Sequence, residues 1–179
     1  MFEGLGRYGA ILADPPWTFR TWSQAGKDRS PEKHYGVMGT DMIAQIPVNE
    51  IAADDAVLFL WTCWPQMPEA LEVIRSWGFE YKTVAFTWVK RNKISDSWFW
   101  GLGHWTRSNP EICILATKGN PHRISKAVHS VVDDRIMRHS EKPDTVRKRI
   151  VELMGDLPRI ELFARNKTEG WDVFGNEVD

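Results

Sequence analysis

The chain has 179 residues, of which 42% are hydrophobic and 26% are charged, a composition typical of a soluble globular protein. Its length favours a single domain over residues 1–179 with a sizeable buried core. The net charge of −1 argues against nucleic-acid binding by charge alone, and no stretch is apolar over the length that a membrane span requires.

Apolar strand-like runs alternate with amphipathic helical stretches along the chain. Strands are predicted over residues 8–13, 56–61, 83–89, 111–117 and 159–164. Helices are predicted over residues 68–77 and 143–154, and each is followed by a glycine, Gly78 or Gly155, that ends it. This alternation predicts an α/β fold, in which a doubly wound, mainly parallel sheet has helices on both faces.

Two long irregular segments, residues 18–39 and 91–110, interrupt this pattern. Long loops in a compact domain are usually functional, and we expect both to lie over the carboxyl edge of the sheet, near Asp14. Other basic clusters flank predicted loops, where a phosphate backbone could run, whereas we interpret the basic run at residues 147–149 as a solvated helix face. Four tryptophans of irregular segments are expected to be partly exposed: Trp22, Trp98, Trp100 and Trp105.

The segment Asp14-Pro15-Pro16-Trp17 directly follows the first predicted strand. Ligands of open α/β sheets bind at the carboxyl ends of strands. There the Asp14 carboxylate and the Pro15 carbonyl could each accept a hydrogen from a nucleobase amine and aim its lone pair at an electrophile. The prolines would hold this backbone still, and Trp17 could stack on the base. The alternative is a plain turn in which Trp17 fills the core.

Other catalytic chemistries find little support in the sequence. The five histidines show no metal-ligand spacing, so we expect no metal site. The two cysteines, Cys63 and Cys113, lie within apolar runs and are interpreted as buried thiols of a reducing compartment. With no signal segment or membrane span in view, we expect a cytoplasmic protein without a membrane partner.

A series of further segments matches a known family in the family's own order and over nearly the whole chain. The segments are residues 2–6, 13–17, 34–38, 57–61, 77–79, 88–90, 103–105, 118–121, 142–144, 160–165 and 175–176. With them the chain resembles the MT-A family of S-adenosylmethionine-dependent adenine-N6 methyltransferases. The resemblance implies a Rossmann-like methyltransferase fold with a permuted motif order, and S-adenosylmethionine as the cofactor.

The resemblance also implies roles for individual residues. Asp14, Pro15, Pro16 and Trp17 would form the catalytic motif, with Asp14 also touching the cofactor, and Trp17 and Tyr35 would contact the target base. Lys142 would hold the methionyl carboxylate of the cofactor, which suits a flexible point charge near a helix start. The remaining expected cofactor residues are Phe163, Arg165, Asn166, Asn176 and Glu177.

Four functions are compatible with these motifs. The leading expectation is methylation of the N6 amine of adenine in DNA, with single-stranded or flipped-out adenine preferred because extrusion from an intact duplex costs a few kcal/mol. The alternatives are adenine-N6 methylation of RNA, cytosine-N4 methylation, and a non-catalytic scaffold subunit that binds nucleic acid. DNA, or else RNA, is the expected partner, and a homodimer or a heterodimer is the expected assembly.

Overall fold

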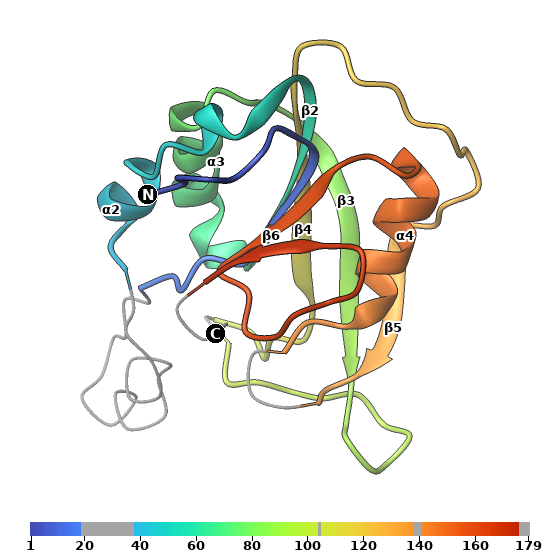
Figure 1. The fold of residues 1–179 in the computed structure, drawn as a ribbon. Helices are drawn as coiled ribbons and strands as arrows, with labels where there is room; N and C mark the ends of the chain where they lie inside the picture. The colour runs from blue at the N-terminus through green and yellow to red at the C-terminus, as the bar shows by residue number, and fades with distance from the viewer. Residues whose placement is uncertain (19–37, 104, 138–140, 176–179) are drawn as a thin grey trace.

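A computed structural model describes residues 1–18, 38–103, 105–137 and 141–175. Within these residues, seven strands form one sheet in the order β5-β3-β4-β2-β1-β6-β7 (Figure 1). The strands are β1 (Tyr8–Ala13), β2 (Ala52–Thr62), β3 (Glu80–Arg91), β4 (Glu111–Lys118), β5 (Val131–Arg135), β6 (Arg159–Leu162) and β7 (Asp172–Phe174).

The sheet is mainly parallel, as the sequence predicts. β4 runs antiparallel to its two neighbours, β2 and β3, whereas every other pair of neighbouring strands is parallel. The strand order also diverges on the two sides of β1: β2 pairs with one side of it and β6, followed by β7, with the other. Ligand sites of open α/β sheets lie at such a switch point, outside the carboxyl ends of the strands.

Helices cover both faces of the sheet, which confirms the doubly wound architecture. α2 (Thr40–Ala44) and α3 (Met67–Ser76) pack on one face, and α4 (Asp144–Met154) packs on the other (Figure 1). β1 is buried along its whole length and supplies both cores, because its side chains alternate between the two faces. Ile11 and Ala13 pack with α2 and α3, whereas Ala10 and Leu12 pack on the side of α4.

One edge of the sheet collects the parts of the chain that carry chemistry. The carboxyl ends of β1, β3 and β6 lie at this edge, and the amino end of β4 lies there too because β4 runs the other way. The described part of the 91–110 segment joins β3 to β4 at the same edge, as expected. Residues 19–37 of the other long segment lie outside the described residues.

The interpretation of residues 147–149 as a solvated face is wrong for its two arginines. Both Arg147 Nε and Arg147 Nη2 donate to the buried carboxylate of Glu161 at 2.7 Å. Arg149 Nη1 donates to the carbonyl oxygens of His129 and Val131, at 2.8 and 2.6 Å. Of residues 147–149 only Lys148 is exposed, and Arg147 and Arg149 hold α4 against the sheet.

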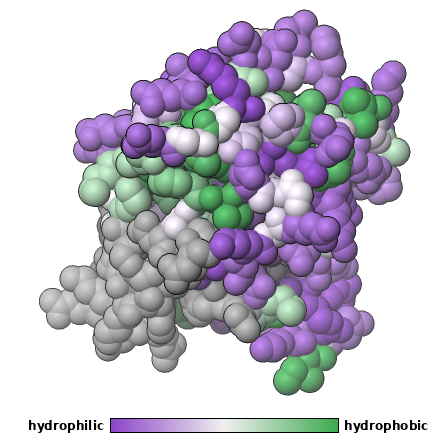
Figure 2. Space-filling view, in the orientation of Figure 1, coloured by the Kyte–Doolittle hydropathy of each residue, from purple (hydrophilic) through white to green (hydrophobic). Residues whose placement is uncertain are grey.

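No helix of the described residues is both long enough and apolar enough to cross a bilayer. The face of the molecule shown in Figure 2 is largely hydrophilic, and its hydrophobic side chains are scattered in small groups.

Candidate active site at the carboxyl edge of the sheet

The Asp14-Pro15-Pro16-Trp17 segment forms a tight turn after β1. The backbone N–H of Trp17 donates to the Pro15 carbonyl at 2.8 Å, and that of Met38 donates to the Pro16 carbonyl at 2.9 Å. A carbonyl oxygen has two acceptor positions, so this bond leaves the Pro15 carbonyl able to accept a second hydrogen. The turn therefore presents the Asp14 carboxylate and the Pro15 carbonyl together at the end of a rigid, buried strand.

Trp17 belongs to the core. Its side chain is 6% exposed, and its indole N–H donates to the backbone carbonyl of Trp61 at 2.9 Å. This packing ties the turn to the end of β2. The burial agrees with the alternative in which Trp17 fills the core, and stacking of Trp17 on a base stays a prediction.

Lys142 reaches the Asp14 carboxylate, 128 residues away in the chain. Its Nζ lies 2.7 Å from Asp14 Oδ2 and 3.4 Å from Glu111 Oε2. The ammonium group also lies over the Trp61 ring, 5.5 Å from the ring centroid. Lys142 immediately precedes Pro143, the N-cap of α4, so the start of this helix positions the ammonium group over the end of β1.

Glu111 and Lys90 complete the cluster, and neither was predicted from the sequence to belong to the site. Glu111 is the first residue of β4, and Lys90 is the penultimate residue of the neighbouring β3. Their side chains form an ion pair, and Lys90 Nζ lies 5.1 Å from the centroid of the Trp88 ring. The result is a row of alternating charges, Asp14–Lys142–Glu111–Lys90, in which each carboxylate has an ammonium partner.

The position of each group in this row determines its protonation. Burial raises the pKa of the Asp14 carboxyl, against the opposing effect of the Lys142 ammonium group. Burial acts in the same direction on Glu111, but Lys142 and Lys90 outweigh it and hold the pKa of Glu111 at about 2. The pKa of Lys142 would fall on burial, but Asp14 and Glu111 raise it. Lys142 is thus a permanent cation, and Asp14 is the more basic of the two carboxylates.

The predicted cofactor residues after β6 lie beside the same edge. Phe163 adopts a positive φ of 61°, and the chain there turns back so that Ala164 donates to the Phe174 carbonyl at 3.2 Å. A Cβ at Gly175 would lie 2.2 Å from the Ala164 carbonyl oxygen, so only glycine permits this close approach. Burial raises the pKa of Asp14, and the positive charge of Arg165 opposes that rise more weakly than Lys142 does, which couples Arg165 to the site electrostatically.

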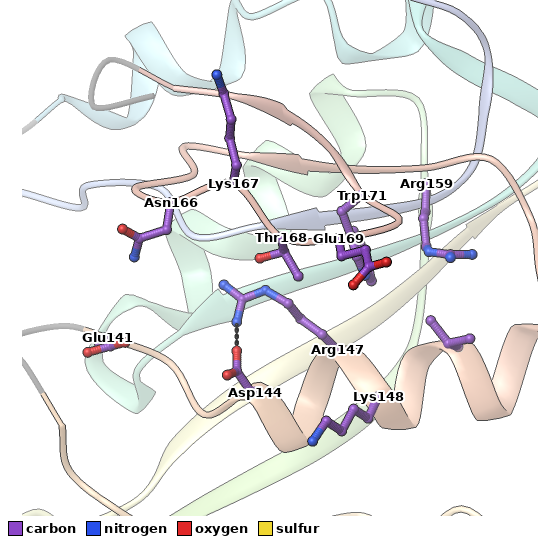
Figure 3. A pocket seen from close by; sticks show the side chains of 11 residues that line it. Glu141, Asp144, Arg147, Lys148, Arg159, Asn166, Lys167, Thr168, Glu169 and Trp171 are labelled. Carbon is purple, nitrogen blue, oxygen red and sulfur yellow. Dashed lines mark hydrogen bonds and ion pairs between the residues drawn. The ribbon is translucent and has the colours of Figure 1, made fainter. Parts of the chain in front are cut away.

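Asn166 lines a cavity of about 650 Å³ between α4 and the segment that joins β6 to β7. Figure 3 shows Arg147 and Lys148 projecting from α4 on one side of this cavity, with the ion pair of Arg147 and Asp144 drawn as a dashed line. Asn166, Lys167 and Thr168 lie opposite them in the same view. Three predicted site residues, Tyr35, Asn176 and Glu177, lie outside the described residues.

The described part of the chain supports neither a metal site nor a nucleophilic cysteine. It contains no group of three or more His, Cys, Asp or Glu side chains arranged to hold a metal ion. Burial raises the pKa of the Cys63 thiol to about 11 and that of Cys113 well above its ordinary value. Both thiols are therefore protonated at neutral pH and unsuited to act as nucleophiles.

Comparisons with known proteins identify relatives over the whole region described above. The MT-A70 family model matches residues 8–177. The Type II methyltransferase M.MunI of Mycoplasma sp is 34% identical, over 96% of this chain and 78% of its own length. The N(6)-adenosine-methyltransferase catalytic subunit METTL3 of Homo sapiens and the MT-A70-like protein of Drosophila melanogaster are each 30% identical over 98% of this chain.

This chain spans less than a third of the two animal proteins, 29% of the human one and 28% of the fly one. The match to the family model begins with β1 and includes the Asp14 turn, Glu111, Lys142 and the segment after β6. The fold, the charged site and the extent of the match agree, and the chain belongs to the MT-A70 family of methyltransferases.

Proposed function

We propose that this protein transfers a methyl group from S-adenosylmethionine to the N6 amine of adenine in DNA. The observation that carries the proposal is the Asp14 carboxylate, which lies at the end of a buried strand with Lys142 Nζ 2.7 Å away. The identity to M.MunI, a Type II methyltransferase, favours DNA as the polymer.

In this proposal Asp14 and Pro15 orient the amine. Its lone pair is delocalised into the adenine ring, so it attacks poorly unless acceptors hold its hydrogens. The Asp14 carboxylate would accept one hydrogen and the Pro15 carbonyl the other, which turns the lone pair toward the methyl donor and stabilises the positive charge that develops on nitrogen. The raised pKa of Asp14 suits a group that takes a share of the leaving proton.

The cofactor is S-adenosylmethionine, the methyl donor of MT-A70 methyltransferases, and it supplies an electrophilic methyl group on a sulfonium. The residues of this edge fit it: a buried ammonium group, Lys142, suits a carboxylate, and the switch point beside β1 suits an elongated ligand. We assign cofactor binding to Asp14, Lys142, Phe163, Arg165, Asn166, Asn176 and Glu177. A cytoplasmic location and a dimeric assembly are proposed with it.

The preferred form of the substrate follows from the cost of reaching the amine. Inside a duplex the adenine is stacked and paired, and extrusion costs a few kcal/mol, least for unpaired strands. A chain with a net charge of −1 has little general attraction for phosphate to offset that cost. We therefore propose single-stranded or flipped-out adenine as the target.

Methyl transfer to matched single-stranded DNA, duplex DNA and RNA tests this assignment. Labelled S-adenosylmethionine is the donor, and a second set of strands carries cytosine in place of adenine. The highest rate is expected on single-stranded DNA that contains adenine. Faster turnover on the intact duplex would contradict the strand preference, and label on the cytosine strands alone would contradict adenine as the target.

RNA is the second candidate, because METTL3 is 30% identical over 98% of this chain and is named as an adenosine methyltransferase. The same site geometry would serve it, since the amine is identical in both polymers. A higher rate on RNA than on the matched DNA strand in the same experiment would favour this candidate.

A further inference from the structure

The segment between β3 and β4, residues 92–110, exposes three large aromatic side chains, and its base contacts Lys90 of the charged site. We call this segment the β3–β4 arm; it extends beyond the end of β3 in Figure 1. Trp98 is 42% exposed, Trp100 54% and Trp105 99%. Of the other described tryptophans, Trp17, Trp61, Trp77, Trp88 and Trp171 are each less than 10% exposed, and Trp64, which follows β2, is 54% exposed. Exposed indoles contribute little to folding, and several together indicate a binding surface.

The arm is held in place by hydrogen bonds at its base. The buried Asn109 side chain accepts from the Lys90 N–H at 2.8 Å and donates to the carbonyl oxygens of Lys90 and Phe99, at 2.9 and 2.5 Å. Further along, the Arg107 guanidinium donates to the carbonyl oxygens of Gly101 and Trp100, at 2.7 and 3.0 Å. These bonds fix the backbone that carries the tryptophans. The entropic cost of ordering this backbone when a ligand binds is therefore small.

The sequence Trp98-Phe99-Trp100 connects the arm to the active site. The ring centroid of Phe99 lies 5.9 Å from Lys90 Nζ, the ammonium group that pairs with Glu111. Trp98 bridges to Arg91, and its ring lies 4.4 Å from the guanidinium carbon of that arginine. The middle aromatic ring therefore belongs to the charged site, while its two neighbours remain available to solvent.

Trp105 lies in a turn whose backbone is unusual for a tryptophan. Its φ is 70°, in the left-handed region that costs a non-glycine residue about 1 kcal/mol or more. At Gly103, with a φ of 68°, a Cβ would lie 1.8 Å from the Thr106 carbonyl oxygen, so the turn requires glycine there. A side chain that is 99% exposed offers no burial to offset the backbone cost. The turn thus presents Trp105 outward without benefit to the fold.

The charges of the arm identify the kind of ligand. The arm carries two positively charged side chains, Lys93 and Arg107, although the whole chain has a net charge of −1. Its one carboxylate, Asp96, pairs with Arg91 and Arg135. Aromatic faces interleaved with cations suit unpaired nucleotides, because each base stacks on a ring and each phosphate meets a positive charge. The bases of an intact duplex already stack on each other and offer no such face.

We infer that Trp100 and Trp105 of the β3–β4 arm stack on unpaired bases of single-stranded DNA, beside the adenine to be methylated. This inference rests on the proposed function and extends it by assigning the contacts to the flanking nucleotides. Stacking on two indoles supplies about 1–3 kcal/mol per base, and this contribution does not require a large basic patch.

Binding measured by fluorescence anisotropy tests the inference without requiring methyl transfer. The variant carries Trp100→Ala and Trp105→Ala together, and Trp98 is kept because it packs on Arg91. The probes are a labelled oligothymidylate of about 15 nucleotides, an abasic strand of the same length, and an oligouridylate. Affinity for the oligothymidylate is expected to fall about tenfold or more at fixed salt, with little change on the abasic strand.

Two further variants are matched controls. Tyr81→Ala removes an aromatic ring that is 44% exposed near the amino end of β3, away from the site, and should leave binding unchanged. Trp100→Phe with Trp105→Phe keeps two stacking rings and should retain most of the affinity. An unchanged melting temperature for all three shows that each is folded.

Four results would overturn the inference. They are an unchanged affinity for oligothymidylate, an equal loss on the abasic strand, a loss confined to oligouridylate, and a changed oligomeric state with DNA binding intact. The last would mark the arm as a surface for a second protein chain. Because the probes contain no adenine, these binding results can be interpreted even if the protein does not methylate adenine.

Discussion

At the scale of single residues, the site depends on one row of alternating charges. Lys142 contacts both Asp14 and Glu111, and Lys90 contacts Glu111 from the other side. Removal of one partner leaves an opposite charge buried without compensation, which costs more than the pair itself contributes. Glu111 is the member whose role is easiest to isolate, because it pairs with both lysines and is not assigned contact with the methyl acceptor.

We predict that Glu111→Gln lowers the free energy of unfolding by about 2–3 kcal/mol at pH 7, since its pKa falls from 4.5 to about 2 on folding. A lowered pKa contributes stability that is complete above pH 4.5 and disappears as the pH falls through 2. The difference between wild type and variant should therefore shrink to about half at pH 3. Urea unfolding at both pH values measures it.

Glu72→Gln, an exposed glutamate on α3, is the control for this measurement. Its unfolding free energy should stay within about 0.5 kcal/mol of wild type. A difference for Glu111→Gln that does not change with pH would show that the ion pairs are not its source.

The residues that the sequence revealed and those that it missed differ in how they are brought to the site. Asp14 directly follows an apolar strand and Lys142 precedes a clear helix, so local pattern and family resemblance located both. Glu111 reaches Lys142 only because β4 inserts antiparallel between β2 and β3. Strand order is a property of the whole chain, and the apolar run after Glu111 does not indicate whether the strand lies parallel or antiparallel to its neighbours.

At the scale of elements, α4 is joined to β6 by a buried ion pair. The Arg147 and Glu161 side chains are 17% and 9% exposed, and two bonds of 2.7 Å connect them. Lys142 directly precedes Pro143, the N-cap of α4, and β6 ends directly before Phe163. This pair therefore fixes the relative position of two elements that carry predicted cofactor residues.

Arg147→Met is predicted to destabilise the protein by about 3–5 kcal/mol, because it leaves the Glu161 carboxylate buried without its partner. Lys148→Met, at the exposed neighbouring position on the same helix, should change stability by less than about 0.5 kcal/mol. Urea unfolding compares the two variants.

A double variant, Arg147→Met with Glu161→Leu, removes both charges and should lie closer to wild type than the single change does. Equal stability of Arg147→Met and Lys148→Met would contradict the structural role of the pair.

The elements that sequence patterns predict best are those buried on both faces. The five predicted strands all exist, and the predicted bounds of the first coincide with those of β1. Three elements were not predicted from the sequence: β5 and β7, which lie at the two edges of the sheet, and the short helix α2. Edge strands are short and half polar, as β5 shows with its sequence VVDDR, so they lack the continuous apolar run that identifies a central strand.

At the scale of the whole molecule, the site is assembled from segments that are far apart in sequence. The turn after β1 contributes Asp14, the centre of the chain contributes Lys90 and Glu111, and the C-terminal third contributes Lys142 and the segment after β6. The sheet is the rigid body that joins them, with a helical layer and a hydrophobic core on each face. Changes in either core should therefore affect the site only through the ends of the strands.

The most direct test of the central claim is nucleoside analysis after incubation of labelled S-adenosylmethionine with single-stranded DNA that contains only adenine and thymine. Wild-type protein should yield N6-methyladenine. Asp14→Ala and Asp14→Asn should lower the rate by about 100-fold or more, because each removes the charged acceptor that orients the amine. Undiminished N6-methyladenine from a folded Asp14 variant would contradict the account, as would label on any position other than N6.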